Sequence, residues 1–225
     1  MTQSGRSFDL VIFDCDGVLV DSERLQNEVF LLMLREIGLQ ITFDDMFEQF
    51  VGHSLAYCMA LAENMLGRAP PADFLPRLQR RTFDAFRHGL TAVDGVVEAL
   101  DRIALPTCVA SGGDHEKIRF TLGHTGLWPR FAGRIFSVAD VPRAKPYPDV
   151  YLHAAATMGA SAARCAVVED TPIGVTAAVA AGMTVFGYAR LTPAVRLEGA
   201  GAQRTFTDMR RLPELLGASM PRSPG

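Results

Sequence analysis

Two aspartates separated by a single residue follow the first apolar run of the chain. The run covers Leu10–Phe13 (LVIF), and Asp14, Cys15, Asp16 and Gly17 come directly after it. Four apolar residues suit a buried strand and are too few for a helix. In open parallel α/β sheets, ligands bind at the edge where the strands end. The sequence therefore predicts a ligand site around this acidic pair.

The pair is suited to nucleophilic and acid–base chemistry on a phosphate ester. Attack of the Asp14 carboxylate on phosphorus would give an aspartyl-phosphate and divide one displacement into two. Asp16 would protonate the leaving oxygen and later deprotonate a water. Gly17 leaves room for a phosphate to approach backbone N–H groups. The alternative interpretation is an ordinary transition from a strand to a turn, where Asp-Gly is common.

Polar groups suited to binding a phosphate follow later in the chain. Ser111 follows the apolar run TCVA, and Gly112 and Gly113 offer N–H groups at the start of a predicted helix. Lys145 lies in the sequence AKPYPD, where two prolines fix a loop that can aim one ammonium at a phosphate and a nucleophile. Each residue alone also fits a simpler role, a helix N-cap for Ser111 and a solvated surface lysine for Lys145.

Glu169 and Asp170 add two carboxylates after the apolar run CAVV. Together with Asp14, these oxygens from two strand ends suit octahedral Mg²⁺. Such an ion would neutralise the repulsion between carboxylate and phosphate and polarise the phosphoryl group. Acidic N-capping of the next helix is the alternative role, and the two roles are compatible.

These groups converge only if the strands that carry them share one parallel sheet. After residue 91, short apolar runs alternate with helical patterns, which is typical of a parallel sheet with helices on both faces. Strands are predicted at residues 10–13, 107–110, 135–138, 165–168, 184–188 and 204–206. Residues 22–89 show only helical spacing, in four segments broken by glycine or proline. We therefore expect an α/β core, residues 1–21 and 90–225, interrupted by a helical insert.

Composition excludes several classes of function. The chain has 225 residues, of which 48% are hydrophobic and 21% charged, as in a soluble globular protein with one large or two small domains. A net charge of −3 leaves no basic surface for nucleic acid or an anionic membrane. No apolar run suits a membrane span and the N-terminus has no secretion signal, so a cytoplasmic location is expected. The widely spaced cysteines are expected to be buried free thiols, namely Cys15, Cys58, Cys108 and Cys165.

The polar groups also occur in the order and context of a known set of motifs. They resemble motifs I to IV of the haloacid dehalogenase-like (HAD) superfamily, in the branch that holds β-phosphoglucomutase and sugar-phosphate phosphatases of the 6-phosphogluconate phosphatase type. The matching stretches are Asp14–Glu23, Ser111, Lys145 in KPYPD, and Glu169 with Asp170 in VVEDTPIGV. The resemblance implies a Rossmann-like doubly wound parallel sheet, an inserted four-helix cap domain over residues 22–89, and a Mg²⁺ cofactor.

The resemblance also implies a role for each matching residue. These roles are nucleophile and metal ligand for Asp14, acid/base and metal ligand through its carbonyl for Asp16, phosphate binding for Ser111 and Lys145, metal ligation for Asp170, and metal support for Glu169. Residues expected to contact the substrate are Gly17, Gly112 and Gly113 in the core and Glu23, Gly52, His53 and Ser54 in the cap.

The function implied is Mg²⁺-dependent hydrolysis of small phosphorylated metabolites, with sugar phosphates as the first class. The acid at position 16 argues against the dehalogenases of the superfamily, whose halide leaving group needs no proton. A phosphosugar mutase is the first alternative, although Leu55 and Gln26 stand here where β-phosphoglucomutase has a cap arginine and a histidine. A non-catalytic phosphometabolite-binding module is the second, but it would not require the acidic pair. No nucleic-acid or membrane partner is expected, and the protein is expected to be a monomer or a weak homodimer.

Overall fold

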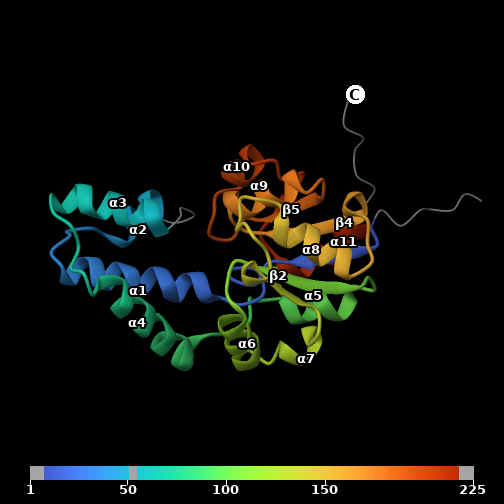
Figure 1. Ribbon diagram of the computed structural model, residues 1–225, viewed down its shortest axis with the longest axis horizontal. Coiled ribbons are helices and arrows are strands. Elements are labelled where there is room, and N and C mark those ends of the chain that lie inside the picture. Colours follow the sequence, from blue (N-terminus) through green and yellow to red (C-terminus); the bar gives the residue numbers. More distant parts are fainter. Residues whose placement is uncertain (1–7, 51–54, 218–225) are drawn as a thin grey trace, which may run out of the picture. The chain divides into compact units, whose positions relative to one another are not determined.

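The computed structural model describes residues 8–50 and 55–217. The chain forms two compact units, one of residues 1–20 and 92–225 and the other of residues 21–91. The first unit is a sheet with helices around it, and the described part of the second consists of helices (Figure 1).

The described part of the first unit contains one sheet of six parallel strands, in the order β3-β2-β1-β4-β5-β6. The strand that carries the acidic pair at its end, β1, pairs with β2 on one side and with β4 on the other. All six predicted strands are present, with ends within one residue of the expected bounds, which confirms the Rossmann-like α/β fold. The strands are β1 Leu10–Phe13, β2 Thr107–Ser111, β3 Ile135–Ser137, β4 Cys165–Glu169, β5 Thr184–Tyr188 and β6 Arg204–Phe206.

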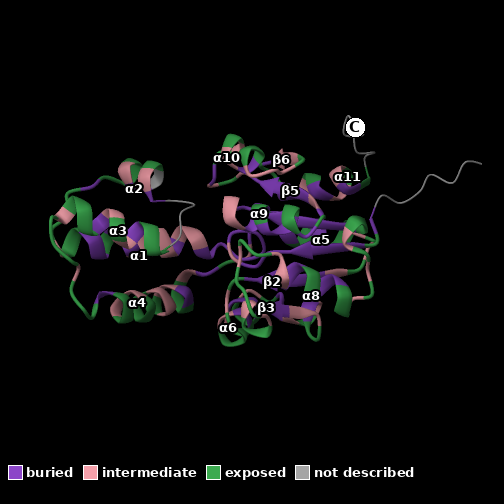
Figure 2. Ribbon diagram, turned by 45° about the horizontal axis from the view of Figure 1, so that its top comes forward, coloured by how far each residue is buried: buried purple, intermediate pink, exposed green. Residues whose placement is uncertain are grey.

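Helices cover both faces of this sheet, which explains why β1 and β4 are buried throughout. On one face, Tyr151 of α8 and Leu197 of α10 share a buried cluster with Ile12. On the other face, the rings of Phe13 and Phe131 of α7 are 6.3 Å apart. Figure 2 shows the buried strands between these layers. The helices of this unit are α5 Val96–Arg102, α6 His115–His124, α7 Trp128–Phe131, α8 Asp149–Thr157, α9 Pro172–Ala180, α10 Ala194–Gly199 and α11 Leu212–Gly217.

The register of the three central strands brings their carboxyl ends level. Phe13 of β1 pairs with Val109 of β2 and with Val168 of β4. The residues that follow these three are Asp14, Ala110 and Glu169. The edge predicted to bind a ligand therefore carries two of the predicted carboxylates and one backbone carbonyl side by side.

A tight turn follows β1 and carries the second aspartate of the pair. Gly17 has φ +76°, in the left-handed region that favours glycine. Its N–H donates to the carbonyl of Val20 at 2.9 Å, and the N–H of Leu19 donates to the carbonyl of Cys15 at 2.9 Å. Backbone hydrogen bonds on both sides of Asp16 thus fix where the chain leaves the sheet.

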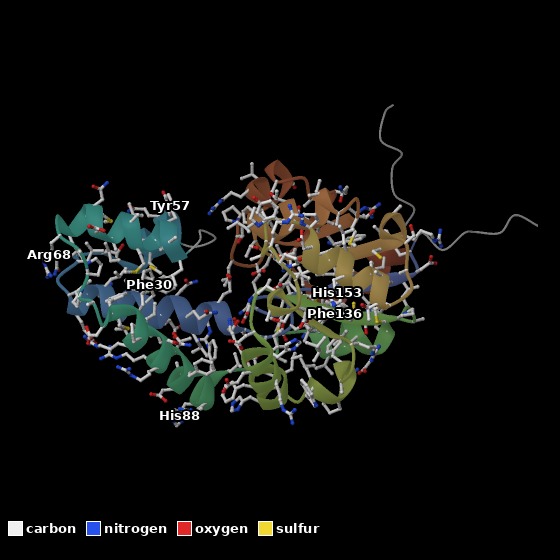
Figure 3. All side chains as sticks on the ribbon, viewed as in Figure 1. Phe30, Tyr57, Arg68, His88, Phe136 and His153 are labelled. Carbon is white, nitrogen blue, oxygen red and sulfur yellow. The ribbon has the colours of Figure 1, made fainter. Side chains whose placement is uncertain are left out.

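The second unit contains the four predicted helices. Its interior is aromatic: Phe30 lies among the helices (Figure 3), and its ring is 5.9 Å from that of Phe50 and 6.1 Å from that of Phe74. Arg81 of α4 also pairs with Glu36 of α1 at 2.5 Å, which joins the two long helices at the surface. The helices are α1 Ser22–Glu36, α2 Phe43–Gln49, α3 Leu55–Leu66 and α4 Phe74–Gly89.

Two short helices of the first unit are not predicted from the sequence. α7 occupies Trp128–Phe131, between α6 and β3, and α10 follows β5. Helices of four and six residues complete too few turns to show a helical period. All four cysteines are buried and free, as predicted. Within residues 8–50 and 55–217, no helix combines the length and apolarity needed to cross a membrane.

Candidate active site

Asp14 continues β1 by one residue at the carboxyl edge of the sheet. Its N–H donates to the carbonyl of Val168 at 3.0 Å, so the ladder between β1 and β4 extends to this position. The residue is buried, and its Oδ1 accepts a 2.6 Å hydrogen bond from Lys145 Nζ. The predicted nucleophile and the predicted phosphate-binding lysine are therefore in direct contact.

The Lys145 ammonium joins the ends of the three central strands. Besides Asp14, which follows β1, it donates to Glu169 Oε1 of β4 at 2.8 Å and to the Ala110 carbonyl of β2 at 3.2 Å. The Lys145 side chain is only 9% exposed, so these contacts are largely shielded from water. A surface lysine would not be held this way, so the simpler interpretation of Lys145 does not apply.

The loop before α8 is held in shape by a second set of contacts. The Arg143 guanidinium donates two hydrogen bonds to the Asp149 carboxylate, at 3.0 and 2.9 Å, and lies 4.5 Å from the centre of the Tyr147 ring. Asp149 is the first residue of α8, and the Lys145–Pro146 peptide bond within the loop is cis. The loop is thereby fixed on both sides of the lysine that it carries.

Burial and neighbouring charges set the ionisation of this contact. Burial raises the pKa of Asp14 to about 7, with help from the carboxylates of Glu169 and Asp16, while Lys145 opposes the rise. Burial alone would lower the pKa of Lys145, but Asp14 and Glu169 keep it well above its usual value. Lys145 is therefore a cation, whereas Asp14 needs a further positive charge to stay fully ionised near neutral pH.

Glu169 accepts hydrogen bonds from the protein at both of its oxygens. Oε1 accepts from Lys145 Nζ at 2.8 Å and from the Tyr151 hydroxyl at 2.9 Å. Oε2 accepts from the N–H groups of Asp170 and Thr171, at 2.9 and 3.0 Å, and from the Thr171 hydroxyl at 3.0 Å. Although burial would raise the pKa of Glu169, Lys145 and these donors hold it below its usual value. The arrangement favours a positioning role for Glu169. The metal role expected from the sequence stays a prediction.

The first turn of α9 lies directly against this carboxylate. Thr171 is the N-cap of α9, and its hydroxyl accepts a 3.1 Å hydrogen bond from the N–H of Gly174. A Cβ on Gly174 would lie 1.6 Å from Glu169 Oε1, so only glycine leaves space for the carboxylate. The first turn of α9 thus leaves space for the Glu169 carboxylate. The partial positive charge at the N-terminus of the helix favours an anion at this place.

Asp170 completes the acidic edge at the end of β4, where it is 3% exposed. Among the described residues, no group of three or more His, Cys, Asp and Glu side chains is arranged to hold a metal ion. Because both oxygens of Glu169 accept hydrogen bonds from the protein, the predicted metal ligands besides Glu169 are the carboxylates of Asp14 and Asp170 and the carbonyl of Asp16. A site of two carboxylates and one carbonyl would leave the remaining positions of an octahedral ion to water and substrate.

Ser111 ends β2 and begins the loop predicted to bind phosphate. Its buried Oγ accepts a 3.0 Å hydrogen bond from the N–H of Gly113. The Ser137 hydroxyl, at the end of β3, donates to the Gly113 carbonyl at 2.7 Å and so fixes the loop from the neighbouring strand. Asp114, and not Ser111, is the N-cap of α6, where its carboxylate accepts from the N–H of Lys117 at 2.8 Å. The exposed Gly112 lies between these anchored residues.

Lys117 contacts the acidic pair although sequence reasoning does not single it out. Its Nζ donates a 2.8 Å hydrogen bond to Asp16 Oδ2, so each acid of the pair has its own ammonium. A signal for it exists in the composition. Lysine and arginine together occur 22 times in the chain, but only two of these residues are lysines. Both contact the acidic pair, Lys145 at Asp14 and Lys117 at Asp16.

The four substrate-binding residues predicted in the cap stay predictions. Glu23 lies in the first turn of α1, in the helical unit. Gly52, His53 and Ser54 lie outside the described residues. The structure therefore brings together the predicted core residues at one sheet edge and leaves the predicted cap residues as predictions.

Comparison with known proteins shows the family to which the chain belongs. Residues 8–182 match the haloacid dehalogenase-like hydrolases. The 6-phosphogluconate phosphatase of Escherichia coli K12 is 31% identical over 211 residues, which cover 92% of this chain and 94% of that protein.

Solved structures share the fold of this chain. A haloacid dehalogenase-like protein of unknown function from Agrobacterium tumefaciens C58 has a TM-score of 0.88 at 37% identity, covering 93% of this chain and 97% of that chain. A HAD family hydrolase from Deinococcus radiodurans R1, with bound phosphate and sodium, has a TM-score of 0.81 at 32% identity, covering 92% of this chain and 94% of that chain. The chain is therefore an enzyme of the haloacid dehalogenase-like hydrolase family, as its four motifs predict.

Proposed function

We propose that this protein is a Mg²⁺-dependent phosphatase that hydrolyses small phosphorylated metabolites through an aspartyl-phosphate on Asp14. The main support is the position of the Lys145 ammonium, which contacts Asp14, Glu169 and the end of β2. A carboxylate that attacks a phosphate ester needs such a cation, because nucleophile and substrate carry the same sign of charge. The similarity to a 6-phosphogluconate phosphatase supports sugar phosphates as the substrate class.

The charges at the sheet edge fit a divalent cation. With all four carboxylates ionised and two ammoniums beside them, the set Asp14, Asp16, Glu169, Asp170, Lys117 and Lys145 has a formal net charge of −2. Hard oxygen donors of this kind suit Mg²⁺, which the carboxylates of Asp14 and Asp170 and the carbonyl of Asp16 would hold. When bound, the ion would supply positive charge that keeps Asp14 ionised. The same charge would offset the negative charge of the phosphate.

In the first half-reaction the Asp14 carboxylate attacks phosphorus in line with the leaving oxygen. A bond forms between Asp14 and phosphorus as the ester P–O bond breaks, and Asp16 gives a proton to the departing alcohol. Lys145 and the Ser111 hydroxyl stabilise the charge on the other phosphoryl oxygens. In the second half-reaction Asp16 takes a proton from the attacking water, and inorganic phosphate and free Asp14 result.

The helical insert, residues 22–89, acts in this proposal as the cap domain that excludes bulk water from the substrate. Its place in the sequence, between β1 and β2, supports this role, because the insert begins directly after the turn that carries Asp16. The residues proposed to select the leaving group are Glu23, Gly52, His53 and Ser54. Exchange of these four for the residues of another phosphatase should change the order of preferred substrates without abolishing hydrolysis.

The test is phosphate release from a panel of phosphorylated metabolites, with p-nitrophenyl phosphate as the reference. We expect turnover that requires Mg²⁺ and is lost in Asp14→Asn, while Asp84→Asn, at an exposed aspartate of α4, behaves like the wild type. Full activity of Asp14→Asn, or no turnover of any phosphate ester, would overturn the proposal. Phosphorus NMR on the same mixtures identifies a phosphosugar mutase, which would move the phosphate between positions of a primed sugar and release little of it.

A further inference from the structure

The contact between Lys117 and Asp16 is a further ion pair at the sheet edge, and the mechanism above does not use it. Lys117 lies in the first turn of α6, and its Nζ donates to Asp16 Oδ2 at 2.8 Å from 101 residues away in sequence. The two side chains are 25% and 21% exposed, so the pair is partly shielded. It joins the turn after β1 to the helix that follows the predicted phosphate loop.

The position of Lys117 is fixed by the start of its helix and by a neighbouring glycine. The N–H of Lys117 donates to the carboxylate of Asp114, the N-cap of α6, at 2.8 Å. A Cβ on Gly113 would lie 3.3 Å from Lys117 Cδ, so the lysine side chain runs closely past this backbone. The same glycine N–H donates to Ser111. One short loop therefore places both the predicted phosphate-binding hydroxyl and the ammonium on Asp16.

The composition of the chain indicates that this lysine is not an arbitrary cation. Apart from Lys117 and Lys145, every lysine or arginine position of the chain holds arginine. Both lysines contact the acidic pair. An ammonium is a compact point charge with three donors, whereas a guanidinium is a wide planar fork. At a carboxylate that must also reach a substrate oxygen, the smaller cation leaves more room.

We propose that Lys117 is a positioning residue for Asp16: its ammonium holds the carboxylate where it can pass a proton to and from the leaving oxygen. This inference rests on the phosphatase function proposed above and adds a residue to its machinery. The two acids are held from different elements, Asp14 by the loop before α8 and Asp16 by α6. The two acids thus have different roles in the proposal, and each is held in place by a different lysine.

The test compares Lys117→Met with the wild type on esters that differ in their leaving group. Alkyl phosphates need the proton of Asp16, whereas p-nitrophenolate leaves without it. We expect kcat/KM of Lys117→Met to fall by about 10- to 100-fold for an alkyl phosphate and by much less for p-nitrophenyl phosphate, because general acid catalysis contributes only to the poor leaving group. Lys117→Arg should recover part of the loss. An equal effect on both esters, or none, would overturn the proposal.

Two controls separate this outcome from misfolding and from failure of the proposed function. Arg119→Met removes a cation from the same helix, where Arg119 lies over the Trp128 ring, and should leave both esters unaffected. In protein made with isotope-labelled lysine, the side-chain NMR signals of the two lysines should respond separately, one to Asp16→Asn and the other to Asp14→Asn. A lysine signal that does not respond to Asp16→Asn would contradict the pairing, whether or not the protein hydrolyses phosphate esters. If the wild type is active and Asp14→Asn is not, normal activity of Lys117→Met refutes this inference alone.

Discussion

The hydroxyl of Tyr151 donates a 2.9 Å hydrogen bond to the carboxylate of Glu169 beneath the sheet edge. The Lys145 ammonium lies 4.7 Å from the centre of the same tyrosine ring and donates to the same Oε1 of Glu169. Tyr151 is fully buried on α8, so this contact is part of the packed core. The core thus supports the lysine of the candidate active site through one hydrogen bond, by way of Glu169, and one cation–π contact.

We expect Tyr151→Phe to lower kcat by about tenfold and to leave KM nearly unchanged, because a positioning contact is lost while the catalytic groups remain. The loss of a hydrogen bond to a buried carboxylate should also lower the free energy of unfolding by about 1 kcal/mol. Steady-state kinetics and denaturant unfolding measure the two effects. Tyr147→Phe, at an exposed tyrosine of the nearby loop, is the matched control. A Tyr151→Phe enzyme with normal kcat would contradict the positioning role.

Gly174→Ala should inactivate the enzyme by displacing Glu169. The new Cβ would lie 1.6 Å from Glu169 Oε1, so the carboxylate must move and lose its contact with Lys145. We expect kcat/KM to fall by about 100-fold or more and the unfolding free energy to fall by about 1–3 kcal/mol. Gly123→Ala is the control, because a Cβ at this position in α6 meets nothing within 4 Å and should be tolerated. Equal behaviour of the two variants would refute the explanation.

The sheet and the core of the site could be predicted from the sequence because their signals are local. Leu10–Phe13 is too short for a helix, and Asp14 follows it directly, so the edge position of the carboxylate needs only the parallel sheet. Lys145 could be predicted because its prolines fix the loop. A helix as short as α7 could not be predicted, because four residues are too few to show a helical period.

Contacts that depend on how a helix packs could not be predicted. Tyr151 fits the apolar face of a core helix, and only the packing of α8 against the sheet brings its hydroxyl to Glu169. Lys117 is similar: its place in the first turn of α6 is visible in the sequence, but the contact with Asp16 depends on the angle at which α6 leaves the sheet. Such angles are set by tertiary packing and leave no periodic trace.

Mg²⁺ should stabilise the folded protein as well as activate it. With its four carboxylates ionised, the acidic edge has a formal net charge of −2, and an ion that binds there in the folded state alone favours folding. A one-site ion adds about 2.7 kcal/mol of stability at about 100 times its Kd. We expect thermal unfolding to shift upward with Mg²⁺ at constant ionic strength, and the shift to shrink in Asp170→Asn. An unchanged melting temperature of the wild type would count against the proposed metal site, and a chelator should abolish turnover.

Arg143→Met should loosen the loop that aims Lys145 without unfolding the protein. The bidentate pair between Arg143 and Asp149 is exposed on the arginine side, and exposed pairs contribute little to stability. Misplacement of the lysine nevertheless affects the reacting geometry, so kcat/KM should fall by about tenfold while the melting temperature hardly changes. Arg87→Met, which breaks an exposed pair with Asp84 in α4, should alter neither. A large drop in stability with normal kinetics would show that the pair serves the fold alone.

The four cysteines should resist thiol reagents in the folded protein. Burial raises the pKa of Cys108 to about 12 and those of Cys58 and Cys165 to about 11, and it also raises the pKa of Cys15 well above its usual value. Because only the thiolate reacts, its small fraction at mildly alkaline pH and the burial of each sulfur both slow the reaction. Ellman's reagent should therefore label the native protein only as it unfolds, and label all four thiols in denaturant. Rapid labelling of the native protein would show that at least one of these sites opens to solvent without global unfolding.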